Sequence, residues 1–135
     1  MTRQSQRIAI DLAAQLDHVR KEIVLERTAE IVAATPVDTT WARSNWVPYV
    51  GEPPTAPNGS PDDVGAAASA QQSAIAAVIA NRDPEAELGL ANNAPYIQQL
   101  NEGSSPQAEA EFVEHAIERA DERVKQRWMA KKIEL

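Results

Sequence analysis

The first third of the chain carries one long helical pattern. Aliphatic side chains recur at spacings of three and four residues from Ile8 to Val32, which places them on one face of a helix expected over residues 5–34. Pro36 ends this helix, because proline disfavours helical dihedral angles in the residue before it. Helices in globular proteins average roughly 10–14 residues, so we expect part of this one to lie on a neighbouring subunit.

Two short strands and a loop are expected in the middle of the chain. Residues 43–50 have the composition of a strand, and Pro48 places that strand at a sheet edge or gives it a bulge. Residues 51–62 are rich in proline and glycine and predict a loop. A second strand is expected over residues 86–91.

Three more helices complete the expected fold. Asp62 or Asp63 can cap a middle helix, with Val78 or Ile79 on its inner side. A short helix over residues 96–101 is stopped by Gly103 in a left-handed conformation. The last helix is expected to start at Ser104 or Ser105 with Pro106, and its apolar stripe is Phe112, Ala116, Ile117, Ala120, Val124 and Trp128.

Together these elements predict one α+β domain over residues 1–135. Long N- and C-terminal helices pack on a small antiparallel sheet, and the proline-rich loop and the middle helix are inserted between its strands. The chain has only three tryptophans, two tyrosines and one phenylalanine, so alanines and aliphatic residues must fill most of the core. That composition favours a subunit that completes its burial against its neighbours.

Composition and charge exclude several classes of protein. The chain has no cysteine, so it has no disulfide and no thiolate metal site. It shows no signal-peptide pattern and no apolar run of transmembrane length, so we expect a protein made in a cytoplasm, without a membrane partner. The net charge is −7, and residues 36–63 and 64–103 each contribute −3, from one arginine against four carboxylates. This balance argues against sequence-specific DNA binding.

Motifs for catalysis are missing. The sequence has no nucleophile elbow, no phosphate-binding loop and no dinucleotide-binding turn. Glu111 and His115 share a helical face, but one carboxylate and one imidazole make half of a metal site. We therefore expect no catalytic, cofactor-binding or metal-binding residues and no enzymatic activity, and a hydrolase using Glu111 and His115 is the least favoured alternative.

The aromatic residues gather at one junction, where Trp41 and Trp46 lie five residues apart. One of them is expected to anchor the strand in the core. The other can point outward, and tryptophan is enriched at the centres of protein interfaces. An outward-facing indole there predicts a contact with another protein.

Two sequence blocks resemble a known family. "TPVDTTWARSNW", residues 35–46, resembles the "TPVDTG…R.NW" signature of the bacteriophage tail-completion family, also described as neck, head-to-tail joining or minor tail proteins. Residues 90–117, "LANNAPYIQQLNEGSSPQAEAEFVEHAI", are similar to its "NN.PY…LE.G.S.QAP.G.V" stretch. The signature positions are Pro36, Asp38, Trp41, Arg43, Asn45, Trp46, Asn92, Asn93, Pro95, Tyr96, Glu102, Gly103 and Gln107.

The chain departs from the family pattern at two places. Thr40 stands where the family has a glycine, which puts a positive-φ turn there in doubt. The "QAP.G" motif becomes Gln107-Ala108-Glu109-Ala110-Glu111, without the proline and without the glycine. Because both helix-disfavouring residues are missing, the last helix can begin as early as Gln107.

The resemblance implies a structural virion protein without cofactors. Such proteins assemble in the host cytoplasm as rings in the neck of the virion and complete the tail around the DNA channel. The implied partners are other copies of the chain, as a hexamer by preference or a dodecamer, together with neck adaptor, stopper or portal-side proteins and the tail tube or tail terminator. DNA passes through the lumen without sequence-specific binding. The alternative is a small soluble adaptor or immunity-type binding module that forms no ring.

The signature residues are expected to shape the fold more than to make contacts. Asp38 can form an Asx-type turn, and Arg43 can pair with Asp38 or with Glu102. The asparagine–proline corner over residues 92–95 is expected to present Tyr96 to the core. Ring contacts are instead expected from the first helix, from the loop over residues 51–62 and from Trp41 and Trp128, and the acidic middle of the chain is expected to approach the lumen.

Overall fold

The computed structural model describes residues 3–36, 40–106 and 108–133, with side chains described from residue 14 to residue 130 within these ranges. Five helices and two strands form in these ranges: α1 (Arg3–Ala34), α2 (Thr40–Ser44), β1 (Val47–Val50), α3 (Val64–Ala80), β2 (Leu88–Ala91), α4 (Ile97–Asn101) and α5 (Phe112–Ile133). The fold is therefore broadly α+β, as expected. In the described residues, no helix combines the length and apolar character that crossing a bilayer requires.

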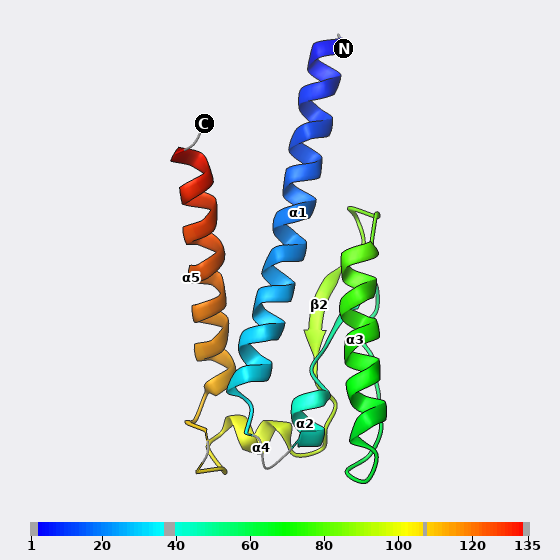
Figure 1. Cartoon of the computed structure of the whole chain (residues 1–135), viewed down its shortest axis with the longest axis vertical. Helices are drawn as coiled ribbons and strands as arrows, with labels where there is room; N and C mark the ends of the chain where they lie inside the picture. Colours follow the sequence, from blue (N-terminus) through cyan, green and yellow to red (C-terminus); the bar gives the residue numbers. More distant parts are fainter. Residues whose placement is uncertain (1–2, 37–39, 107, 134–135) are drawn as a thin grey trace.

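Helix α1 is the centre of the arrangement. Helix α5 packs along it in the opposite direction, and α1 also contacts both strands (Figure 1). Helix α3 packs on β1 and runs roughly parallel to α5. The N-terminal part of α1 extends beyond the ends of α3 and α5 (Figure 1).

The two strands form one antiparallel pair. Val47 lies opposite Ala91, and Val50 lies opposite Leu88. Pro48 is thus in an edge strand, where a residue without a backbone N–H is tolerated. Tyr49 lies across Gly89, where an added Cβ would come within 2.3 Å of the tyrosine ring. The glycine makes room for the aromatic ring.

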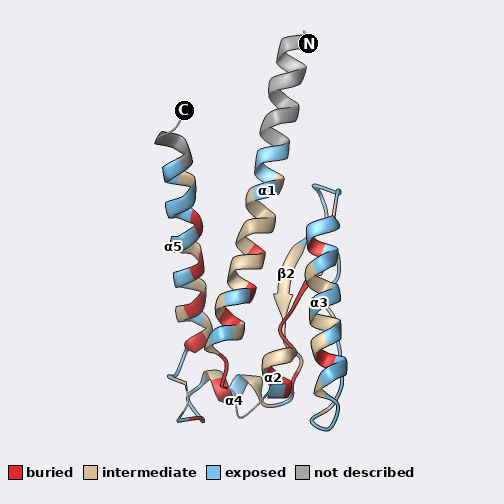
Figure 2. Cartoon of the chain, in the orientation of Figure 1, coloured by how far each residue is buried: buried red, intermediate tan, exposed pale blue. Residues whose placement is uncertain are grey.

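The core lies at the lower end of the α1–α5 pair, above α2 and α4 (Figure 2). Two clusters of buried side chains lie there. The first contains Ala42, Ala94, Leu100 and Phe112, and the second contains Ile31, Trp46 and Ala116. The alanines let the helices approach closely, as the aromatic-poor composition requires. Buried residues follow the side of α5 that faces α1 (Figure 2).

The predicted start of the first strand was four residues too early. Residues Thr40–Ser44 form α2, because this turn of helix buries Trp41 and Ala42. Strand β1 begins only at Val47. Thr40, which stands where the family has a glycine, is the first residue of α2.

The predicted start of the last helix was also wrong. Helix α5 begins at Phe112 and not between Ser104 and Gln107, because Glu111 adopts a left-handed φ of 62°. Asn101 holds this turn: its carbonyl accepts from the Glu111 N–H at 2.5 Å, and its side-chain oxygen accepts from the Val113 N–H at 2.9 Å.

Two predicted helix ends and one predicted buried position are confirmed. The Asp63 carboxylate accepts from the Ala66 N–H at 3.2 Å and caps α3. Val78 is the inward residue of the predicted pair, because Ile79 is 55% exposed. Gly103 ends α4 with a φ of 102°.

Candidate assembly site

The two sequence blocks meet where Asn92 of the second block binds α2 of the first, and Asn45 connects the first block to the loop over residues 51–62. The side chain of Asn45 is buried, and it binds the backbone of Asn58 in the proline-rich loop in both directions. Asn45 Oδ1 accepts from the Asn58 N–H at 2.7 Å, and Asn45 Nδ2 donates to the Asn58 carbonyl at 3.1 Å. The indole N–H of Trp41 donates to the same carbonyl at 2.7 Å. The first block thus anchors the loop that follows it.

The second block holds the same region from the other side. Asn92 Nδ2 donates to the carbonyl of Ala42 in α2 at 2.7 Å, and its Oδ1 accepts from the Ala94 N–H at 2.9 Å. Asn93 Nδ2 donates to the carbonyl of Pro54 at 3.0 Å. The asparagine–proline corner therefore links α2, the loop and the start of α4.

We call the region where α2, the loop over residues 51–62 and residues 92–95 meet the joint. Trp46 connects the joint to the end of α1. Its indole N–H donates to Thr35 Oγ1 at 2.9 Å, and that hydroxyl donates to the carbonyl of Ile31 at 2.7 Å. Gln71 of α3 donates to the carbonyls of Arg43 and Trp46 at 3.2 and 2.9 Å. Helices α1 and α3 are thus both tied to the segment between α2 and β1.

Arg43 does not pair with Glu102, and its predicted pairing with Asp38 lies outside the described residues. Its Nε donates to the carbonyl of Val32 in α1 at 2.8 Å. Glu102 is exposed and accepts instead from Gln98 at 3.3 Å. Arg43 still orients α2 against α1, but it does so through a backbone carbonyl near the end of the helix. Asp38 lies outside the described residues, and so does Gln107.

Both tryptophans of the first block are inside the molecule. Trp41 and Trp46 are each 8% exposed, and the hydrogen bonds above satisfy both indole N–H groups. The prediction that one of them faces outward is wrong for this fold, whereas the ring contact of Trp41 stays a prediction. The backbone carbonyl of Asn58 and the side-chain hydroxyl of Thr35 hold the two indoles inside the molecule.

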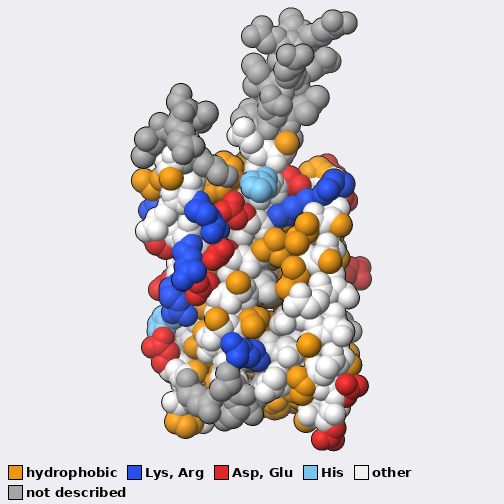
Figure 3. All heavy atoms as spheres, viewed as in Figure 1, with side chains coloured by type: hydrophobic (Ala, Val, Ile, Leu, Met, Phe, Trp, Pro, Cys, Tyr) orange, Lys and Arg blue, Asp and Glu red, His pale blue; other side chains and the backbone are white. Residues whose placement is uncertain are grey.

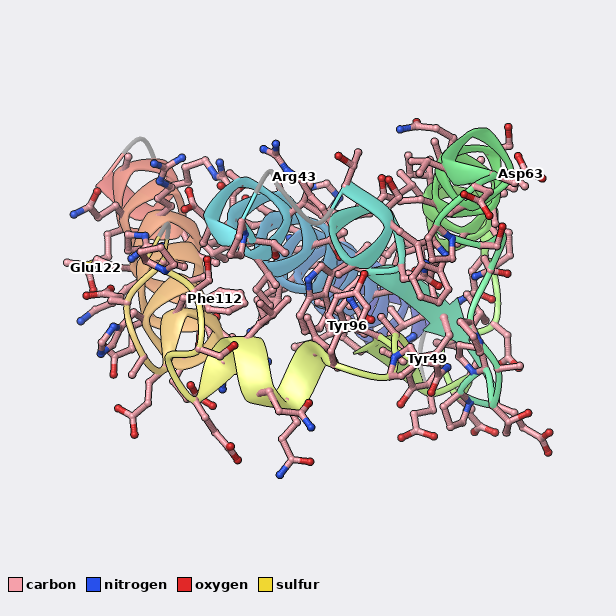
Figure 4. The ribbon with its side chains drawn as sticks, turned by 90° about the horizontal axis from the view of Figure 1, so that it is seen from below. Arg43, Tyr49, Asp63, Tyr96, Phe112 and Glu122 are labelled. Carbon is pink, nitrogen blue, oxygen red and sulfur yellow. The ribbon has the colours of Figure 1, made fainter. Side chains whose placement is uncertain are left out.

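Tyr96 closes the joint from below. Its ring lies 6.0 Å from that of Trp41, measured between ring centroids and at a tilt of 56°. Burial raises the pKa of the Tyr96 hydroxyl. Tyr96 lies toward the middle of the molecule in Figure 4, whereas Asp63 and Glu122 lie at opposite sides. Pro95 is exposed, and the buried residue that α4 contributes is Leu100.

A second polar system joins α1 to α5 along their exposed side. Arg119 pairs with Glu30, Arg123 with Glu30 and Glu26, and Arg127 with Glu26 and Glu22, at 2.7 to 3.7 Å. Figure 3 shows the basic side chains as a column along α5 beside the acidic side chains of α1. This ladder of ion pairs was not predicted from the sequence, although the three glutamates on α1 and the three arginines on α5 each recur every four residues.

Trp128 joins this ladder at its upper end. Its indole N–H donates to Glu22 Oε2 at 3.0 Å, and its ring lies 6.3 Å from that of His18. Partial burial opposes ionisation of Glu22, but the hydrogen bonds from Trp128 and Arg127 outweigh it and hold the pKa of Glu22 below its ordinary value. Trp128 is half-buried, so it remains a candidate for a contact with another chain.

The Glu111–His115 pair does not form. Glu111 lies before α5 in the left-handed turn, and His115 Nδ1 is 2.8 Å from Glu109 Oε1 instead. This hydrogen bond raises the pKa of His115, and burial opposes it only in part. In the described part of the chain, no three histidine, cysteine, aspartate or glutamate side chains group as metal ligands would.

Apolar side chains are exposed away from the joint. Leu16 on α1 is 67% exposed and Met129 on α5 is 56% exposed. Leu25 and Ile79 line an open groove between α1 and the upper end of α3, where hydrophobic side chains gather in Figure 3. The apolar face of α1 thus continues past the part that the chain itself covers.

A scan of protein-family models matched no family, and searches of curated proteins and of solved structures gave no match either. Function is therefore inferred from the residues, from the resemblance of the two blocks and from the geometry of the joint that they form. The side-chain amides of Asn45, Asn92 and Asn93 are all hydrogen-bonded to backbone groups in the joint.

Proposed function

We propose that the chain is a structural protein of a bacteriophage virion that forms a ring at the head–tail junction and completes the tail around the DNA channel. In this proposal, long terminal helices pack on a small sheet, and the proline-rich loop and middle helix inserted between its strands give the tail-completion arrangement. The chain acts without a cofactor. Its partners are its own copies, a hexamer by preference, and the neck and tail proteins above and below.

The observation that carries the proposal is the meeting of the two resembling blocks. Asn45 and Trp41 of the first block hold the loop from one side, and Asn93 of the second block holds it from the other. The blocks are more than forty residues apart in the sequence. If a family signature defines a fold, its residues should meet in the structure, as these residues do at the joint.

Glu111 supplies independent support. It occupies the position of the family's glycine, and it has a left-handed φ of 62°. L-residues adopt this conformation at a cost, so the fold keeps a glycine-type turn although the glycine is missing. At this position the side chain differs from the family's glycine, but the backbone conformation is one that glycine favours.

The exposed surfaces fit a ring. In a ring, each subunit presents one patch to a different patch of its neighbour. The N-terminal part of α1, which extends past α5, the exposed Leu16 and the Trp128 end of α5 are our candidates for one such patch. The acidic residues between 36 and 103 are our candidates for the lumen, where like charges repel DNA.

Deletion of the gene from the phage that encodes it tests the proposal. We expect filled heads and separate tails in electron micrographs of the lysate, and joined particles after the wild-type chain is supplied in trans. A variant with the exposed change Gln72→Ala should restore joining as the wild type does. Normal particles from the deletion would contradict the proposal and favour a soluble adaptor that is not part of the virion.

A further inference from the structure

The outer edge of β2 has hydrogen-bonding groups without partners. The Gly51 N–H donates to the carbonyl of Glu87, directly opposite, at 2.8 Å. Hydrogen-bonded and non-hydrogen-bonded residue pairs alternate along an antiparallel ladder. Because Gly51 and Glu87 form a hydrogen-bonded pair, Tyr49–Gly89 and Val47–Ala91 are the next hydrogen-bonded pairs between β1 and β2. The backbone groups of Leu88 and Leu90 therefore point away from β1. Among the described residues, none forms a hydrogen bond with them.

The opposite edge of the sheet differs from this one. Pro48 and Val50 occupy the outward positions of β1, and proline has no N–H to offer a further strand. An exposed edge with intact donors and acceptors is a template for another strand, and proline is one of the devices that blocks it. Strand β2 is thus the edge that can accept a partner.

The free edge opens on a trough along α1. Arg20 of α1 donates to the carbonyl of Ala86, the next outward-facing group along the same edge, at 2.7 Å. Two hollows of about 250 and 370 Å³ lie side by side here, one against β2 and one against α5, and they share Ile23 and Arg27. Neither is an enclosed cavity. A strand added to β2 would lie over this trough, with alternate side chains facing Ile23.

The charge of the trough selects its occupant. Arg20, Arg27 and Lys125 line it. Asp17 binds Arg20 at 3.0 Å and Asp121 binds Arg27 at 2.8 Å, so the sum over these five side chains is +1, carried by Lys125. The whole chain carries −7. The trough therefore attracts an acidic segment, and its apolar floor suits apolar residues at every second position.

We propose that the β2 edge binds an extended, proline-free, acidic segment of a partner protein as a third strand of the sheet. The exposed loops of this chain are poor donors of such a strand, because residues 51–62, 81–87 and 102–111 all contain proline. Addition of a strand to an open edge is a recurrent mode of peptide recognition, in which main-chain hydrogen bonds give affinity and alternate side chains give specificity. The inference does not depend on ring assembly.

Hydrogen exchange of the full chain, read by NMR, tests this inference. In the isolated chain, the amides of Leu88 and Leu90 should exchange fast and those of Gly89 and Ala91 slowly. The probe is a ten-residue peptide of alternating valine and threonine with a glutamate at each end. At about 1 mM peptide, exchange at Leu88 and Leu90 should slow by at least about tenfold, which corresponds to a Kd of about 0.1 mM or tighter.

Two matched controls sharpen the test. The same peptide with N-methyl groups at every second residue, on the edge that pairs with β2, should give no protection. Leu88→Pro removes an outward donor from β2, and Val50→Pro removes the donor that lies directly opposite on β1. Binding should be lost in the first variant and kept in the second.

Several results would overturn the proposal. These are equal binding of the N-methylated peptide, no protection at 1 mM, or unchanged binding by a folded Leu88→Pro variant. Protection of Leu88 and Leu90 in the chain alone that rises with protein concentration would also overturn it, because the edge would then pair with a second copy. The exchange measurements on the wild-type chain decide the matter even if a proline variant does not fold.

Discussion

The side chain of Asn45 and the backbone of Asn58 hold each other by two hydrogen bonds, at 2.7 and 3.1 Å, across the base of the proline-rich loop. Asn45 is 1% exposed, so water cannot replace this partner. An amide is the side chain for the position, because it donates and accepts at once. The loop is thereby fixed to α2 by the residue that ends the first sequence block.

Replacement of Asn45 by alanine should destabilise the fold and release the loop. A buried group left without its partner costs about 1–3 kcal/mol, so we expect the free energy of unfolding to fall by about 2–3 kcal/mol in urea titrations. Limited proteolysis should then cut within residues 51–62. Gln72→Ala removes an amide from the exposed side of α3 and serves as the control. A loss below about 0.5 kcal/mol for Asn45→Ala would show that the joint is not what holds the loop.

Glu111→Gly should stabilise the chain. The left-handed conformation costs a non-glycine residue about 1–2 kcal/mol, and Glu111 has a φ of 62°. We expect a gain of about 1 kcal/mol in thermal or urea unfolding. Glu118→Gly, inside α5, should instead lose about 1 kcal/mol, because glycine is a poor helix former. Equal losses in both variants would mean that the turn before α5 is not formed.

Glu22 should make stability depend on acid pH. The pKa of Glu22 is lower in the folded chain than its ordinary value of 4.5, so its contribution is full above that value and is lost as the pH falls through the folded pKa. Unfolding free energies measured from pH 7 to pH 3 should fall less steeply for Glu22→Gln than for the wild type. Trp128→Phe, which removes one donor to Glu22, should change the slope in the same direction. Parallel curves for all three proteins would contradict this assignment.

Gly89 should tolerate alanine only if Tyr49 is removed. A Cβ at residue 89 would meet the Tyr49 ring at 2.3 Å, and overpacking costs about 1–3 kcal/mol. We expect Gly89→Ala to lose about 2 kcal/mol in the wild type and clearly less in a Tyr49→Ala background. A double-mutant cycle measures that coupling. Additive losses would show that the ring does not lie across the glycine.

Local signals predicted much of this fold, and long-range contacts decided the rest. The period of α1, the Asp63 cap and the stop at Gly103 depend on neighbouring residues, so they could be read from the sequence. The start of α5 could not, because Asn101 holds Glu111 in a turn that helix propensity alone would not form. The inward position of Trp41 depends likewise on Asn58, seventeen residues away. The signature residues of the joint were found through the resemblance, but their partners came only from the structure.

A density map of the head–tail junction of the virion tests the central claim most directly. The account predicts a closed ring of this chain around the DNA channel, with the N-terminal part of α1 and the Trp128 end of α5 against neighbouring copies and the joint of Asn45 and Asn93 inside each subunit. A virion neck without this chain, or with a single copy that contacts no other, would contradict it.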